Sequence, residues 1–124
     1  MLNILDLIGR IFISLLFLVN GYFKISNYDG TYDWMESYNV PGILLTPAII
    51  LEFAAPILII IGYKTKIAAF LLVAFCVTTA LIFHTDFTSQ TQVTSFLKNI
   101  ALAGGFLFIV VNGAKKYSFD NKIK

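Results

Sequence analysis

The sequence is poor in charge and in cysteine, and each shortage excludes a class of protein. Only 13% of its 124 residues are Asp, Glu, Lys or Arg, whereas 58% are hydrophobic. Soluble domains have about 25% charged and about 45–50% apolar residues, so this composition excludes an ordinary soluble protein. The single cysteine, Cys76, excludes an internal disulfide and any paired-cysteine redox motif.

Basic residues and metal ligands are also too few to indicate their usual partners. The formal net charge is +2, and the nine Lys and Arg residues are scattered rather than gathered in a patch, so no nucleic-acid partner is predicted. His84 is the one histidine and has no second His or Cys nearby, so no metal site is predicted. Ligand patterns for haem or iron–sulfur clusters are missing from the sequence.

Long apolar runs are what the sequence has in abundance. A helix needs about 20 apolar residues to cross the ~30 Å hydrocarbon core of a bilayer. Four runs of about this length cover residues 4–23, 44–63, 67–83 and 95–111. They predict an all-α fold, an integral membrane four-helix bundle, formed by a single domain over residues 1–124. The lipid bilayer is therefore the first expected partner.

The longest polar connection, residues 25–43, is rich in Tyr and Trp. Such side chains concentrate at membrane–water interfaces, so we expect them to anchor this connection there. Thr31 is expected to cap a short surface helix that runs to about Tyr38.

The basic residues predict the orientation. With four spans, both termini and the 62–66 turn share one side of the membrane. That side carries Arg10, Lys64, Lys66, Lys115, Lys116, Lys122 and Lys124, and the other side carries Lys24 and Lys98. The positive-inside rule then places both termini in the cytoplasm of a bacterial-type plasma (inner) membrane. Asp6 and Arg10, four residues apart near the start of the first span, are expected to pair.

One carboxylate, Glu52, interrupts the second apolar run. A charge within a membrane span is expensive unless it is paired, and by default it marks a partner or a pathway. Pro56, four residues later, cannot donate a backbone hydrogen bond to the Glu52 carbonyl and predicts a kink there.

Polar residues of the other spans are predicted to lie at a similar depth, in the outer half of the membrane. With Glu52 the set is Asn20, Lys24, Glu52, His84, Lys98 and Asn99. We therefore predict an outward-opening polar pocket with Glu52 as its deepest charge and Lys24 as its expected partner. Such a pocket suits a polar small molecule, a quinone headgroup or protons.

Each of these side chains also has a purely structural interpretation. The Glu52–Lys24 pair could only hold two helices together, and Lys98 could extend to the interface without binding anything. The two asparagines could hydrogen-bond between helices, and His84 could simply end the third span. Thr78 and Thr79 are expected to bond back to their own helix. Cys76 is expected to be inert packing.

Several short motifs, in their order and spacing, resemble the DoxX-like family of membrane proteins. They are Arg10 with the run ending at Gly21-Tyr22-Phe23-Lys24, Val40-Pro41, Leu51-Glu52, Tyr63-Lys64-Thr65-Lys66, His84, Lys98-Asn99-Ile100-Ala101-Leu102 and Tyr117-Ser118-Phe119-Asp120. Asn20 departs from the small residue that is more usual there. The resemblance implies a four-helix membrane protein and, from the systems that give the family its name, a small subunit of quinone- or quinol-linked redox systems. A redox partner subunit and a homo-oligomer both stay open.

Three functions remain in competition at this point. In a redox-associated subunit, Glu52 would accept or relay a proton, Lys24 would hold it ionised and His84 would exchange protons near neutral pH. In a small proton-coupled transporter, Glu52 would couple protons to a cationic substrate, which Lys24 would repel. In a structural or assembly protein, the polar cluster would only fix the register of the helices.

Overall fold

The computed structural model describes residues 2–115, 118 and 120. These residues form five α-helices and one 3-10 helix: α1 Leu2–Ser26, α2 Tyr28–Ser37, η1 Gly42–Leu44, α3 Leu45–Ile61, α4 Thr65–Phe83 and α5 Gln90–Asn112. Within this described part, four segments are long and apolar enough to cross a membrane, namely Leu2–Ser26, Gly42–Ile61, Thr65–Phe83 and Gln90–Asn112. The predicted all-α membrane bundle is confirmed.

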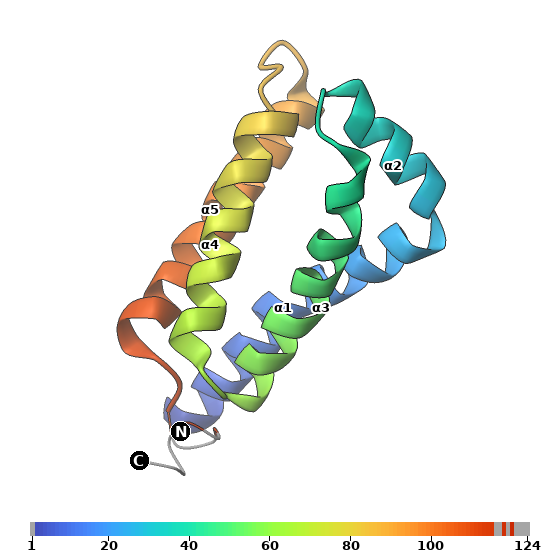
Figure 1. The fold of residues 1–124 in the computed structure, drawn as a ribbon. Helices are drawn as coiled ribbons and strands as arrows, with labels where there is room; N and C mark the ends of the chain where they lie inside the picture. The colour runs from blue at the N-terminus through green and yellow to red at the C-terminus, as the bar shows by residue number, and fades with distance from the viewer. Residues whose placement is uncertain (1, 116–117, 119, 121–124) are drawn as a thin grey trace.

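The four long helices form two pairs that lie side by side, α1 with α3 and α4 with α5 (Figure 1). One end of the bundle carries the N-terminus, the turn between α3 and α4 and the segment after α5; we call it the terminal end. The opposite end carries α2 and the loop between α4 and α5, and we call it the loop end (Figure 1). Helix α2 lies obliquely beside the loop end of α3, as a short element outside the four spans.

Two element starts differ from the expectation. Thr31 does not cap a helix, because α2 already begins at Tyr28 and the Thr31 hydroxyl donates to the Asn27 carbonyl at 2.9 Å. Helix α5 begins at Gln90, before the apolar run that was expected to start at residue 95. Polar residues continue this helix beyond the apolar run, so Lys98 and Asn99 lie more than two turns inside α5 rather than in its first turns.

Helix α3 ends where its sequence predicts, at a glycine. It runs through Pro56 without ending and stops at Gly62, whose φ of 76° is left-handed. The Gly62 and Tyr63 amides both donate back to the Leu58 carbonyl, at 2.8 and 3.0 Å. A glycine in this conformation is the usual way to end a helix, and here it turns the chain directly into α4.

The apolar core is divided into two clusters. The larger one joins all four long helices around Phe17, Ile59, Leu72 and Phe106, and the rings of Phe17 and Phe106 meet edge to face at 5.5 Å. The smaller one lies toward the loop end and consists of Met35, Leu45, Ile49 and Phe83. Helix α2 contributes Met35 to this second cluster, which ties the short helix to the bundle.

Candidate functional site

The predicted pairing of Glu52 with Lys24 is present and joins α3 to α1. Lys24 Nζ donates to Glu52 Oε1 across 2.6 Å. The Glu52 side chain is 2% exposed and that of Lys24 is 28% exposed, so the carboxylate is the buried partner. Lys24 Nζ also lies 5.4 Å from the centre of the Phe75 ring of α4, close enough for a cation–π contact.

A cavity of about 330 Å³ opens beside this ion pair. All six polar residues singled out in the sequence line it: Asn20, Lys24, Glu52, His84, Lys98 and Asn99. Most of the remaining wall is apolar and comes from every helix, including Phe17 of α1, Leu45 of α3 and Leu102 of α5. A small polar cluster is thus enclosed by a largely hydrophobic wall.

On the α4 and α5 wall of the cavity, the side chains of Thr79, His84 and Asn99 are hydrogen-bonded. Thr79 Oγ1 donates to the Phe75 carbonyl at 2.9 Å, as expected for a threonine within a helix, and accepts from Asn99 Nδ2 at 3.3 Å. His84 follows the end of α4, where its Nδ1 lies 3.1 Å from Gln92 Oε1 of α5. These contacts fix the α4–α5 wall of the cavity.

Helix α2 closes the cavity on the side of the loop end. Thr31, Trp34 and Met35 belong to the lining. The Trp34 ring stacks on Phe83 of α4 with centroids 4.4 Å apart and an interplanar angle of 24°, and Tyr38 meets the same ring edge-on at 5.1 Å. At its other end, α2 is tied to α3 by a 2.8 Å hydrogen bond between the hydroxyls of Tyr28 and Thr46.

Sequence reasoning missed these contributions of α2 to the wall of the cavity. The aromatic residues of this region were expected to be interface anchors, but Trp34 faces the cavity. The position of Trp34 and Met35 three and four residues after Thr31, on one face of a helix, was the available signal. Cys76, expected to be packing, is buried among the core residues and also lines the cavity beside Glu52.

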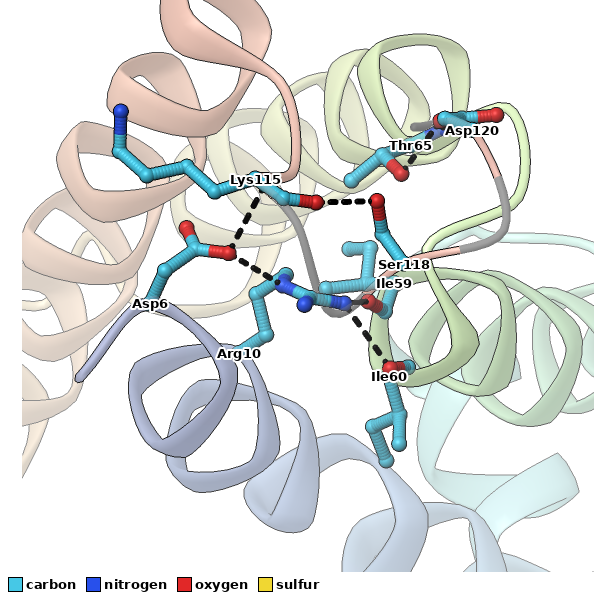
Figure 2. Close-up of polar contacts among 8 residues, drawn as sticks. All are labelled: Asp6, Arg10, Ile59, Ile60, Thr65, Lys115, Ser118 and Asp120. Atoms are coloured by element: carbon cyan, nitrogen blue, oxygen red, sulfur yellow. Dashed lines mark hydrogen bonds and ion pairs between the residues drawn. The ribbon is translucent and has the colours of Figure 1, made fainter. Parts of the chain in front are cut away.

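A second polar cluster closes the terminal end of the bundle (Figure 2). Arg10 is 2% exposed, and its Nη1 donates to the carbonyls of Ile59 and Ile60 at 2.8 and 2.9 Å. These carbonyls belong to the last turn of α3, which has no further helical amides to bond. Asp6 accepts from Arg10 Nε at 3.0 Å, as the sequence predicted, and from the Lys115 backbone amide at 3.1 Å.

Asp120 completes this cluster by capping α4. Its carboxylate accepts from the backbone amides of Lys64 and Thr65 at 2.7 and 2.8 Å and from the Thr65 hydroxyl at 2.7 Å. Its own amide donates to the Gly62 carbonyl at 2.7 Å. The Ser118 hydroxyl donates to the Lys115 carbonyl. We call the contacts of Asp6, Arg10, Lys115, Ser118 and Asp120 the terminal clasp. Lys116, Tyr117, Phe119, Lys122 and Lys124, which entered the predictions of orientation and family, lie outside the described residues.

The comparison with known families matches this architecture. The DoxX family model covers residues 5–85, a range that includes Lys24, Glu52 and His84. The chain belongs to the DoxX family. Two relatives of this DoxX protein are inner membrane proteins of Escherichia coli strain K12. YqjF is 37% identical over 114 residues, which cover 92% of this chain and 88% of YqjF. YphA is 33% identical over 126 residues, which cover 96% of this chain and 90% of YphA. No solved structure matches the chain.

Proposed function

We propose that this DoxX protein binds the headgroup of a membrane quinone or quinol in the cavity beside Glu52 and acts as a small subunit of a membrane redox system. The observation that carries the proposal is the Lys24–Glu52 ion pair, whose carboxylate is buried at the wall of an otherwise largely apolar cavity. A quinone headgroup is an apolar ring with two polar oxygens, and this cavity offers both kinds of surface.

The size of the cavity supports a compact ligand. At about 330 Å³ it lies at the small end of the roughly 300–1,000 Å³ range of ligand pockets. A single substituted ring suits this volume better than an extended polar molecule. The surrounding bilayer would accept the apolar tail that membrane quinones carry.

Within the proposal, the chain's own residues bind and orient the headgroup and hold a proton acceptor beside it. Lys24 donates a hydrogen bond to the Glu52 carboxylate, and Trp34 stacks on Phe83 at the loop end of the cavity. Electrons would come from a redox partner subunit, as the family resemblance implies. The relatives are named inner membrane proteins, and we propose the same membrane for this chain, with both termini in the cytoplasm.

A structural or assembly role is the second candidate, and the same ion pair favours it. The Lys24–Glu52 contact links α1 to α3 across the bundle, which is what a purely architectural pair would do. This candidate requires no ligand in the cavity. A test of ligand binding therefore separates the two candidates directly.

The experiment compares two alanine substitutions on α3. Ala48→Phe adds a ring at a residue that lines the cavity, whereas Ala54→Phe adds the same ring at an exposed position outside the lining. Each variant and the unmodified protein are purified gently, and retained quinone is quantified by mass spectrometry. Trp34, the single tryptophan, lines the cavity, so its quenching by added tetramethyl-1,4-benzoquinone gives an independent measure.

We expect the unmodified protein and Ala54→Phe to bind quinone alike and Ala48→Phe to lose at least about tenfold in affinity, which is 1.4 kcal/mol. Equal binding by both variants would place quinone outside the cavity and contradict the proposal. The absence of saturable binding in the unmodified protein would favour the architectural role.

A further inference from the structure

One oxygen of the Glu52 carboxylate is buried without a hydrogen-bond partner. Oε1 accepts a hydrogen bond from Lys24 Nζ. Oε2 is shielded from solvent and accepts no hydrogen bond from any residue that the structure describes. The residue as a whole is 2% exposed and belongs to the cavity lining. The cavity wall thus contains a polar atom whose bonding capacity is unused.

The chemistry of this atom restricts what can satisfy it. A carboxylate that is ion-paired to lysine only accepts hydrogen bonds and cannot donate one. Leaving a buried acceptor unsatisfied is costly, so a ligand that supplies a donor at this point is favoured over one that does not. A quinone has carbonyl oxygens, which only accept, whereas a quinol has hydroxyl groups, which donate.

Two neighbouring polar side chains, Thr79 of α4 and Asn99 of α5, are hydrogen-bonded to each other. The Thr79 hydroxyl donates to the Phe75 carbonyl, and an amide hydrogen of Asn99 is directed at the Thr79 oxygen. The Lys24 ammonium group donates one hydrogen bond to Glu52 Oε1 and has further N–H groups. These can donate to a quinone carbonyl oxygen or to a quinol hydroxyl oxygen alike. Among the described residues that line the cavity, only Glu52 has a fully buried side-chain oxygen without a hydrogen-bond partner, and this acceptor favours the hydroxyl-bearing form of the ring.

We infer, resting on the proposed quinone-binding function, that the cavity selects the reduced, hydroxyl-bearing form of its ligand through a hydrogen bond from a ring hydroxyl to Glu52 Oε2. Glu52 is then the specificity-determining residue of the site. Lys24 positions the carboxylate so that Oε2 remains free for the ligand. The selection is a matter of binding alone and involves no electron transfer within this chain.

The test uses three probes that share one ring. Tetramethylhydroquinone carries donors, tetramethyl-1,4-benzoquinone is its oxidised form, and the dimethyl ether of the hydroquinone cannot donate. Their affinities are measured by anaerobic equilibrium dialysis against the purified protein in detergent micelles, with protein-free micelles subtracted. Ala48→Phe serves as the control for binding outside the cavity.

We expect the hydroquinone to bind at least about fivefold more tightly than either the quinone or the dimethyl ether, as the cost of a buried unsatisfied acceptor implies. Glu52→Gln replaces Oε2 by an amide that donates, with the amide oxygen left to Lys24, so this variant should prefer the quinone. The comparison of probes on the unmodified protein stands even if the variant fails to fold.

The outcomes separate the inference from the proposed function. Equal or tighter binding of the quinone, or of the dimethyl ether, to the unmodified protein would overturn the inference while the cavity remained a quinone site. Binding of none of the three probes would overturn the proposed function and the inference together. An unchanged preference in a folded Glu52→Gln variant would show that another group makes the selection.

Discussion

Arg10 is a charged residue that α1 holds almost entirely out of solvent at the terminal end. Its guanidinium donates hydrogen bonds to two α3 carbonyls and to the Asp6 carboxylate. An arginine can do this because its planar fork presents several donors in fixed directions, which a lysine does not. The residue therefore closes a helix end and neutralises a carboxylate with one side chain.

Arg10→Met removes these donors and leaves Asp6 and the α3 carbonyls without the guanidinium. We expect the free energy of unfolding to fall by about 3 kcal/mol, as for the loss of one partner from a buried ion pair. Unfolding in mixed micelles with increasing dodecyl sulfate, followed by the fluorescence of Trp34, measures the change.

Lys115→Ala is the matched control. Asp6 contacts the backbone amide of Lys115, which alanine retains, and the residue is exposed. Its effect should lie within about 0.5 kcal/mol. If Arg10→Met were as stable as Lys115→Ala, the buried guanidinium would not stabilise the fold.

Some of these residue contacts follow from the sequence and others do not. The Asp6–Arg10 pair follows from a spacing of four on a helix, and the Lys24–Glu52 pair follows from the cost of a charge within a span. The bonds from Arg10 to Ile59 and Ile60 do not, because they depend on the depth at which α3 ends beside α1. Backbone carbonyls carry no sequence signal.

At the scale of elements, the turn between α3 and α4 reverses the chain within residues 62–64. Gly62 has a φ of 76°, and a Cβ at this position would overlap the Cβ of Ser118. Two features therefore require glycine at position 62: the left-handed backbone conformation and the close approach of the terminal clasp.

Gly62→Ala should accordingly lower the free energy of unfolding by at least about 2 kcal/mol, from left-handed strain and from displacement of Ser118. The same dodecyl sulfate titration measures it. Gly104→Ala, within α5, is the control, since a Cβ there meets nothing within 4 Å. That substitution should be neutral or stabilising by up to about 1 kcal/mol. Equal effects of the two would contradict the role of Gly62.

The sequence predicted the number of spans well, since long apolar runs admit few alternatives in a bilayer. It predicted the start of α5 poorly, because the polar residues from Gln90 to Thr94 lack the hydrophobic pattern on which the prediction rested. It also predicted α2 as a surface element without its inward-facing Trp34. That contact depends on the neighbouring end of α4, where Phe83 presents a ring.

The whole molecule has an uneven distribution of charge between its ends. The terminal end carries Arg10, Lys64, Lys66 and Lys115, and the exposed carboxylates of α2 lie toward the loop end. The excess of basic residues at the terminal end is the basis of the proposed orientation, in which the loop end, with the cavity beside α2, faces the outside of the cell.

Single cysteines introduced at exposed positions test this orientation. Ser37→Cys on α2 and Thr85→Cys after α4 should react with a membrane-impermeant maleimide in intact cells, whereas Lys115→Cys should react only after permeabilisation. The native Cys76 is buried and should give little background. Labelling of Lys115→Cys in intact cells, with protection of Ser37→Cys, would invert the topology and turn the cavity toward the cytoplasm.

The terminal clasp also constrains the order in which the protein can be completed during synthesis. Asp120 caps a helix that begins more than fifty residues earlier in the chain, at Thr65. When α3 and α4 leave the ribosome, the residue that seals their junction has not yet been made. The junction therefore lacks this cap until α5 and Asp120 have been synthesised. In this protein a residue that is translated after all four spans closes the turn between the second and the third of them.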